Sequence, residues 1–128
     1  MNQKLLLIED DKAQQLVWKQ VFRFLGDFEV TIANDGFEGL KKLSESLDVI
    51  VLDISMPRMN GIDFLKEFYG KKKYAKFTKI PIIVLTVWID DEEVTAAMKQ
   101  FQQVKFLNKE DDRKKVVEKV KQIIAEWV

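Results

Sequence analysis

Short runs of Leu, Ile and Val recur along this chain, and three of them are followed at once by a polar side chain. The runs are Leu5-Leu6-Leu7-Ile8 before Glu9 and Asp10, Val49-Ile50-Val51-Leu52 before Asp53, and Ile82-Ile83-Val84-Leu85 before Thr86. A shorter segment, Phe106-Leu107, is followed by Lys109. In a parallel α/β sheet, ligands bind at the carboxyl ends of the strands. The pattern therefore predicts one pocket that holds acids, a hydroxyl and an ammonium group.

The alternation of apolar runs with longer helical stretches predicts repeated βα units. We expect strands at residues 4–8, 28–33, 48–53, 81–86 and 104–107, and helices at 12–25, 36–46, 62–74, 90–102 and 111–126. The first, third and fourth strands are almost continuously apolar, as is typical of strands covered on both faces, whereas the second and fifth include polar residues that suit sheet edges. We therefore predict an α/β fold with a single doubly wound, five-stranded parallel sheet in the order 2-1-3-4-5 and five helices, the flavodoxin-like arrangement.

The size and composition of the chain narrow the possible functions. At 128 residues the chain fits one domain, 1–128. With no Cys and no His, the sequence excludes disulfides, thiolate metal sites and serine–histidine catalysis. Lys plus Arg and Asp plus Glu balance at 21 each, so no overall field favours nucleic acid. The apolar runs are too short for a membrane span. We expect a cytoplasmic protein that binds neither nucleic acid nor membrane directly.

The three acids of the predicted pocket would repel one another strongly. At about 4 Å and an effective dielectric constant near 20, each pair of like charges costs about 4 kcal/mol. Such a cluster must keep a proton or recruit a cation. Oxygen ligands with open positions suit Mg²⁺ or Mn²⁺, which also bind phosphate oxygens. Lys109 adds a point charge that can meet a phosphoryl oxygen, and Thr86 adds a hydroxyl donor.

Together these segments resemble the receiver domain of two-component response regulators, and the resemblance covers the whole chain. The spacing from Asp53 through Met-Pro to Gly61 is its most specific part. The matching segments are Leu-Leu-Leu-Ile-Glu9-Asp10-Asp11, Val-Ile-Val-Leu-Asp53-Ile-Ser-Met-Pro57-Arg-Met-Asn-Gly61, Pro81-Ile-Ile-Val-Leu-Thr86 and Phe106-Leu-Asn-Lys109. Asn60-Gly61 and Met56-Pro57 are also expected to break the chain before the third helix.

The resemblance implies a role for each residue of the pocket. Asp53 would accept a phosphoryl group from a sensor histidine kinase, a histidine phosphotransfer protein or a small acyl phosphate. Mg²⁺ or Mn²⁺ would bind Asp10, Asp53 and the backbone carbonyl of Ser55, with Glu9 acting through water. In this alignment Asp11 starts the first helix, whereas the alternative alignment makes Asp10 and Asp11 the acidic pair. The domain would catalyse only its own phosphorylation and dephosphorylation, and would not be an enzyme that acts on a separate substrate.

The resemblance also implies a conformational switch. A phosphoryl group on Asp53 adds about −1.5 to −2 charge and three acceptor oxygens. Thr86 and Lys109 would be drawn to those oxygens, and Phe106 would enter the space that Thr86 leaves; the alternative is that Phe106 is simply a packed edge-strand residue. The face formed by helix four, strand five and helix five would then repack and bind an unknown output partner. We expect this face to include Lys99, Gln103, Lys105 and Lys121. A phosphorylation-dependent homodimer is left open.

The first helix supplies a second surface. Its apolar stripe is predicted to consist of Val17, Val21 and Leu25, with Trp18 and Phe22 beside it. On the flank nearest the acidic pocket lie Ala13, Leu16 and Gln20. By resemblance, this flank would dock the helical bundle of a kinase. The alternative is that Leu16 merely borders the core.

The chain departs from the family pattern at three positions. Glu110 follows Lys109 where the family has a cis proline, and a cis bond without proline costs about 2.5–4 kcal/mol, so we expect a trans loop here. Val87 and Trp88 follow Thr86 where the family prefers Ala or Gly in the first position. Both would crowd the approach to Asp53. Slow phosphoryl exchange and a long-lived phosphoaspartate are therefore expected.

Two other functions remain open from the sequence. A phosphatase of the haloacid dehalogenase type also ends a strand on Asp, but it needs a second Asp two positions later, where this chain has Ser55. A receiver-like interaction module that no longer accepts phosphate would also fit Glu110, Val87 and Trp88.

Overall fold

The computed structural model describes residues 2–54 and 59–127. Within them, five parallel strands form one sheet in the order β2-β1-β3-β4-β5, which confirms the predicted fold class. The strands are β1 (Lys4–Ile8), β2 (Glu29–Ala33), β3 (Val49–Ile54), β4 (Ile82–Thr86) and β5 (Lys105–Asn108). The helices are α1 (Lys12–Gly26), α2 (Gly36–Lys41), α3 (Met59–Gly70), η1 (Lys72–Phe77, a 3₁₀ helix), α4 (Glu92–Gln100) and α5 (Arg113–Glu126).

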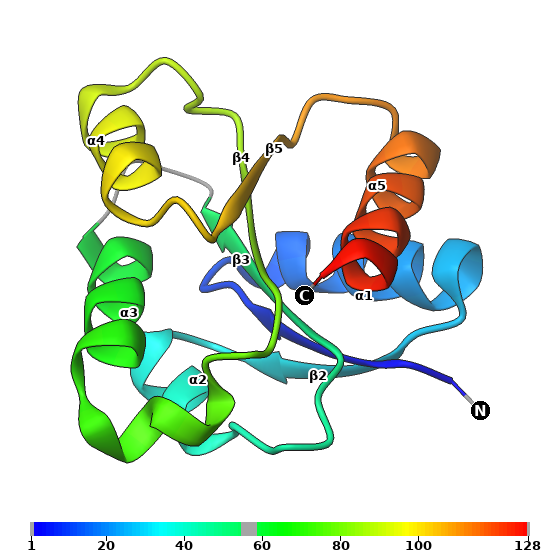
Figure 1. Cartoon of the computed structure of the whole chain (residues 1–128). Helices are drawn as coiled ribbons and strands as arrows, with labels where there is room; N and C mark the ends of the chain where they lie inside the picture. The colour runs from blue at the N-terminus through cyan, green and yellow to red at the C-terminus, as the bar shows by residue number, and fades with distance from the viewer. Residues whose placement is uncertain (1, 55–58, 128) are drawn as a thin grey trace.

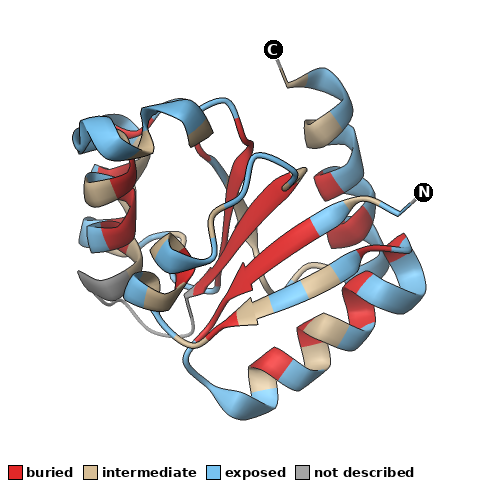
Figure 2. Cartoon of the chain, turned by 90° about the horizontal axis from the view of Figure 1, so that it is seen from below, coloured by how far each residue is buried: buried red, intermediate tan, exposed pale blue. Residues whose placement is uncertain are grey.

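The helices cover both faces of the sheet. Figure 1 shows α1 and α5 on one face and α2, α3 and α4 on the other. Each face has its own core of buried apolar side chains. Strands β1, β3 and β4 are almost wholly buried between these layers, while β2 alternates between exposed and half-buried residues (Figure 2). The polar pattern of β2 and β5 therefore marks the edges of the sheet, as predicted.

Aspartate side chains fix the starts of three helices. Asp11 accepts a hydrogen bond from the Gln14 amide at 3.1 Å, and Asp35 accepts one from the Glu38 amide at 2.8 Å. Asp91 accepts hydrogen bonds from two amides at the start of α4. Such caps satisfy backbone donors that the first helical turn leaves unpaired. The cap at Asp11 confirms that this residue starts the first helix, so that Glu9 and Asp10 precede it.

The second and third helices differ most from the predicted ranges, and the other helix ends lie within about two residues of them. The second helix ends at Lys41 and not at residue 46, because the Ser44 hydroxyl accepts a hydrogen bond from the Ser46 amide and closes a turn there. The third helix begins at Met59, so Asn60-Gly61 lies within the helix and does not break the chain before it. It ends at Gly70, and η1 replaces its predicted last turn.

The predicted apolar stripe of α1 is confirmed at Val17 and Val21 and wrong at Leu25. Trp18 and Phe22 are buried, whereas Leu25, which was assigned to the main stripe, is 53% exposed. The aromatic side chains fill the space against Phe28 and α5, so the helix faces the core along them. Over the described ranges, no helix is both long and apolar enough to cross a membrane.

Candidate functional site

The chemically active residues of the prediction converge at the carboxyl edge of the sheet. Asp53 lies on β3, Thr86 ends β4, and Glu9 and Lys109 directly follow β1 and β5. The strand register places Asp53 opposite Leu85, one residue before Thr86, and pairs Thr86 with Asn108. Glu9, Asp53 and Thr86 are all buried, at 1%, 4% and 0% exposure. Four distant parts of the sequence thus supply one small polar site within an apolar sheet.

Asp53 and Lys109 form a buried ion pair at the centre of this site. The Lys109 Nζ lies 2.5 Å from Asp53 Oδ1, and both side chains are almost fully enclosed. The Lys109 backbone amide also donates to the Thr86 carbonyl oxygen at 2.9 Å, which anchors the lysine loop to β4. The lysine charge is therefore fixed against the carboxylate by both its side chain and its backbone.

The Asp53 carboxyl is only partly compensated by this lysine. Burial raises its pKa to about 6; Lys109 opposes the increase, and Asp11 and Asp10 add to it. Within the described residues, neither Asp53 oxygen has a partner in hydrogen-bond geometry, although Oδ1 lies in ion-pair contact with Lys109. A buried acceptor of this kind is costly unless a further cation or donor meets it. A second positive charge next to Asp53 would therefore stabilise its ionised carboxylate.

Glu9 is the second buried acid of the site. Its Oε1 accepts a hydrogen bond from the Asp11 amide at 3.2 Å, but its Oε2 has no partner within the described residues. Burial and the nearby Asp53 raise the pKa of Glu9 to about 8. Burial is the larger cause, because low-dielectric surroundings disfavour the ionised carboxyl, and the negative charge of Asp53 adds to it.

The predicted cluster of three carboxylates is therefore only partly formed. Asp10 is exposed, although it lies close enough to raise the pKa of both Glu9 and Asp53. Across residues 2–54 and 59–127, no three acidic side chains are grouped closely enough to hold one metal ion. Ser55, which was predicted to contribute a backbone carbonyl, lies outside the described residues.

The donor set still suits a hard divalent cation. Mg²⁺ commonly binds through one or two carboxylates and keeps several waters. In the described part of the chain, Glu9 Oε2 and Asp53 Oδ2 are buried without a partner, and Asp53 Oδ1 is paired with Lys109. The chemistry of these donors therefore fits Mg²⁺.

Thr86 and Phe106 are the two residues predicted to form a switch, and they lie on the adjacent strands β4 and β5. The Thr86 hydroxyl accepts a hydrogen bond from the Trp88 amide at 3.0 Å. Phe106 is half-buried and packs against the core that lies under α3 and α4. This packing is what the edge-strand alternative predicts, and it also leaves Phe106 on the strand next to the one that Thr86 ends, as the switch requires.

The three departures from the family pattern have different surroundings. Val87 and Trp88 are 40% and 41% exposed. Val87 and Lys109 line a hollow of about 350 Å³ beside α1. Glu110 is exposed, its amide donates to the Asn108 side chain at 2.9 Å, and the peptide bond before it is trans, as predicted.

The predicted docking flank of α1 faces solvent. Ala13, Leu16 and Gln20 are exposed, and Leu16 is 60% exposed, which contradicts the alternative that it borders the core. Of the predicted output face, Lys99, Gln103 and Lys105 are exposed. Lys121 instead lies over the Phe28 ring, with its Nζ 4.8 Å from the ring centre, and so faces the α1 side.

One polar residue next to the site, Gln15, was not predicted from the sequence. Gln15 is buried in α1, and its Nε2 donates to the Glu9 carbonyl at 2.6 Å and to Asn34 Oδ1 at 2.8 Å. Asn34 also donates to Glu38 at 3.0 Å. The available signal was a polar residue three positions before Trp18, on the buried face of the helix. Gln15 therefore ties the loop that carries Glu9 to the start of α2.

The sequence is similar to curated signalling proteins. The family model described as "Response regulator receiver domain" matches residues 5–121. The chain is 38% identical over 88 residues to the transcriptional regulatory protein CpxR homolog of Haemophilus influenzae, a match that covers 69% of this chain and 36% of the relative. It is 34% identical over 98 residues to the chemotaxis protein CheY1 of Helicobacter pylori, covering 75% of this chain and 77% of that protein. The chain spans about a third of the length of the transcriptional regulators that it matches.

Solved structures show the same fold. The CheY-like response regulator receiver domain protein of Methanospirillum hungatei superposes with a TM-score of 0.77 at 25% identity, covering 99% of this chain and 97% of that one. The receiver domain of the sensor histidine kinase PA1611 of Pseudomonas aeruginosa superposes with a TM-score of 0.70 at 23% identity, covering 99% and 98%. That structure has a magnesium ion coordinated in its active-site cleft.

Proposed function

Because the chain belongs to the response regulator receiver domain family, we propose that residues 1–128 form a phosphoacceptor signalling domain in which Asp53 is the accepting residue. The observation that carries this proposal is the buried Asp53 carboxyl, paired with Lys109 but without hydrogen bonds to either oxygen among the described residues. An acid held in this way keeps its lone pairs available for attack on phosphorus. Membership of this family also sets aside the dehalogenase-type phosphatase.

In the proposed reaction, an ionised Asp53 oxygen attacks the phosphorus of a phosphohistidine on a kinase or phosphotransfer protein. A new P–O bond forms as the P–N bond breaks, and the histidine keeps the electron pair of that bond. The Lys109 ammonium lies beside Asp53, where it would meet a phosphoryl oxygen and offset its charge. A small acyl phosphate would donate in the same way, with an acyl carboxylate as the leaving group.

The same residues would hold the divalent cation. Asp53 would bind Mg²⁺ directly together with Asp10 and the Ser55 carbonyl, and Glu9 would act through water; Mn²⁺ has the same preference for oxygen ligands. When bound, the cation supplies positive charge against the phosphoryl oxygens. The unpartnered oxygens of Glu9 and Asp53 support this assignment. Since both acids have raised pKa values, a bound cation would also keep them ionised at neutral pH.

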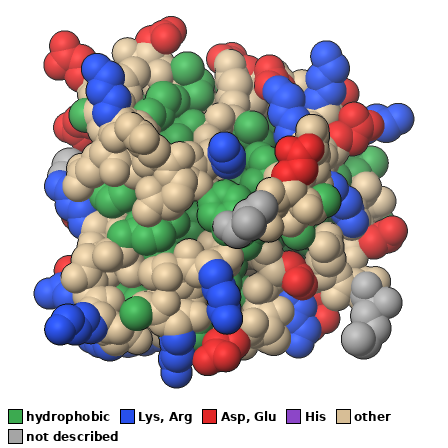
Figure 3. Space-filling model, viewed as in Figure 1, with side chains coloured by type: hydrophobic (Ala, Val, Ile, Leu, Met, Phe, Trp, Pro, Cys, Tyr) green, Lys and Arg blue, Asp and Glu red, His purple; other side chains and the backbone are tan. Residues whose placement is uncertain are grey.

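The conformational change that follows phosphorylation would begin at Thr86. Its hydroxyl accepts a hydrogen bond from the Trp88 amide and its own O–H can still donate one, so a movement of Thr86 towards a phosphoryl oxygen would also pull on the β4–α4 loop. Phe106 would then occupy the vacated space, and the surface around α4, β5 and α5 would change. In Figure 1, β5 runs between α4 and α5. Figure 3, in the same view, shows hydrophobic side chains near the middle of this face. An output partner, or a second phosphorylated copy, would bind this face.

The proposed upstream partner would dock on α1. Ala13, Leu16 and Gln20 lie exposed on the helix that Asp11 caps, two residues after Glu9. An exposed Leu16 is a suitable contact for the apolar side chain of a kinase helix. Docking there would bring a phosphohistidine to the mouth of the acidic site.

Acetyl phosphate with Mg²⁺ provides a direct test of the phosphoacceptor. We expect the intact protein to gain one phosphoryl group by mass spectrometry, and Asp53→Asn to gain none, because an amide is a poor nucleophile. Asp48→Asn, a change at an acid outside the site, is the matched control and should still be phosphorylated. A protein that gains no phosphate at any magnesium concentration would instead be a receiver-like interaction module.

Val87 gives a second test, of the lifetime of the phosphorylated state. Val87 lines the hollow beside Lys109, where it would hinder a water molecule that approaches a phosphoaspartate. Val87→Ala is therefore expected to speed the loss of phosphate severalfold, as followed by intact mass after removal of the donor. An unchanged rate in Val87→Ala, or rapid loss from the unaltered protein, would contradict the expected slow exchange.

A further inference from the structure

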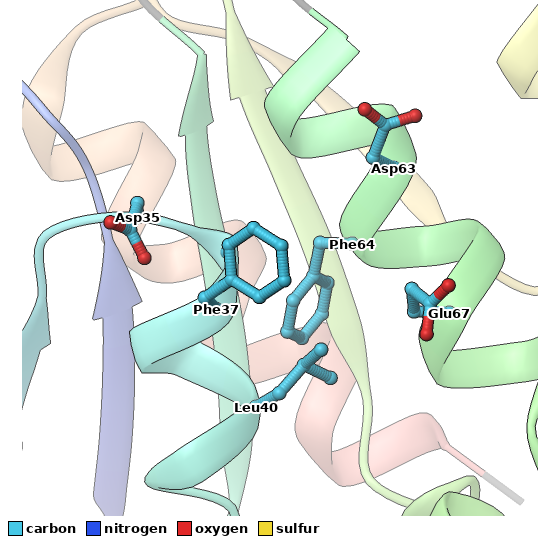
Figure 4. Close-up of a pocket in the computed structure, with 7 residues that line it drawn as sticks. Asp35, Phe37, Leu40, Asp63, Phe64 and Glu67 are labelled. Carbon is cyan, nitrogen blue, oxygen red and sulfur yellow. The ribbon is translucent and has the colours of Figure 1, made fainter.

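A small hollow lies between α2 and α3, separate from the residues of the acidic site. Its volume is about 180 Å³. Figure 4 shows Phe37, Leu40 and Phe64 grouped at its centre, with Asp35 on one side and Asp63 and Glu67 on the other. Neither α2 nor α3 lies on the face that carries α1, so this hollow is also distinct from the proposed kinase surface (Figure 1).

Two phenylalanines line the centre of the hollow, one buried and the other exposed. Phe64 is 2% exposed and belongs to the core, whereas Phe37 is 79% exposed. A single exposed aromatic side chain is common on protein surfaces. Here, however, Phe37 borders a concave site with a buried apolar floor, which is the arrangement of an anchor pocket in a protein interface.

The size of the hollow restricts its occupant. Small-molecule and cofactor sites commonly measure about 300–1,000 Å³, and this hollow is smaller. It suits one bulky side chain. The occupant that fits this volume is therefore a segment of another protein that inserts a single apolar side chain into the hollow.

The rim of the hollow carries negative charge. Asp35, Asp63 and Glu67 line it, and none of its lining residues is Lys or Arg. Asp63 and Glu67 are four residues apart on α3, a spacing at which like charges repel. In the described part of the chain, neither of them forms an ion pair or a side-chain hydrogen bond, while the neighbouring Glu38 is already paired with Lys42 at 2.8 Å. The carboxylates of Asp63 and Glu67 can therefore pair with a cation from another molecule.

We propose that the α2–α3 hollow docks a basic segment of a partner protein, which inserts an apolar side chain beside Phe37 and places an arginine against Asp63 and Glu67. Charge complementarity favours a cationic partner, since all the charged groups that line the hollow are acidic. Arginine suits this rim better than lysine, because its planar guanidinium can pair with carboxylates and stack on an aromatic ring. The partner could bind while a kinase occupies α1 on the opposite face of the sheet.

A titration of the full chain by NMR tests this proposal. The probe is a short peptide with capped ends in which arginine is next to leucine, and the control peptide replaces the arginine by glutamate. We expect the first peptide to shift backbone amides of residues 35–40 and 63–67, and the second to leave them unchanged. The affinity should fall as salt is added, because exposed charges are screened.

Matched variants of the protein make the test specific. Phe37→Ala should weaken binding about tenfold, as expected when an interface anchor is truncated, while Phe24→Ala removes another exposed phenylalanine, 74% exposed on α1, and should have no effect. Glu67→Gln should weaken binding, and Glu118→Gln on α5 should not. No binding at millimolar peptide, shifts that map elsewhere, or equal affinity in Phe37→Ala would overturn the proposal. The same shifts on raising the protein concentration alone would identify a second copy as the occupant and would also overturn it.

Discussion

Replacing Lys109 by methionine is expected to lower the free energy of unfolding by about 3–5 kcal/mol at pH 8, as is typical when one partner of a buried ion pair is removed. Lys109 is the cation in contact with Asp53, and both side chains are enclosed. Without it, Asp53 and the nearby Glu9 become buried acids with no compensating charge beside them. Urea unfolding followed by circular dichroism measures this loss directly.

The pH dependence of this loss identifies its cause. Lys109 lowers the pKa of Asp53 against the larger effect of burial, so its removal raises that pKa above about 6. A protonated Asp53 needs no cation, and the difference between the variant and the unaltered protein should therefore shrink below about pH 5. Lys115→Met, at an exposed position of α5, is the matched control and should change stability little. A loss that stays the same from pH 5 to pH 8 would indicate altered packing and not an uncompensated charge.

The sequence predicted the fold and the location of the site because both follow from the strands. Continuous apolar runs mark central strands, and parallel strands end at the same edge, so Asp53, Thr86 and Lys109 had to lie near one another. Asp11 was identified as the start of the first helix because an aspartate before a helical stretch is a strong cap. These signals are local, or depend only on topology.

The remaining features depend on packing between elements. Leu25 matched the apolar period of α1 but stays exposed, because Trp18 and Phe22 fill the contact with α5 and Phe28. The hydrogen bonds of Gln15 to Glu9 and Asn34 join three separate segments, and no local pattern shows them. The α2–α3 hollow likewise arises from the packing of two helices that β3 separates in the sequence. Such features follow from the tertiary arrangement and are not visible in periodicity.

The metal-free protein is expected to lose stability as the pH rises from about 4.5 to about 8, and Mg²⁺ is expected to restore it. The folded-state pKa of Glu9 is raised from 4.5 to about 8, and that of Asp53 from 3.8 to about 6. Over this range the folded state binds more protons than the unfolded chain, so the free energy of unfolding falls with rising pH. For Glu9 the total loss is roughly 3–5 kcal/mol, since a tenfold change in an acid constant corresponds to about 1.4 kcal/mol.

Glu9→Gln separates this contribution from that of every other titrating group. Its amide carries no charge at any pH, so its stability should fall less than that of the unaltered protein between pH 5 and pH 8, as measured by urea unfolding in the presence of a chelator. Added Mg²⁺ should stabilise the unaltered protein most at pH 8, where both acids are ionised, and least at pH 5, where protons compete for the same oxygens. Glu118→Gln, a change at an exposed acid on α5, should follow the unaltered protein throughout. Parallel curves for Glu9→Gln and the unaltered protein would contradict a raised pKa of Glu9 in the folded state. Stabilisation by Mg²⁺ that is independent of pH would show that the two buried carboxyls do not take part in holding the cation.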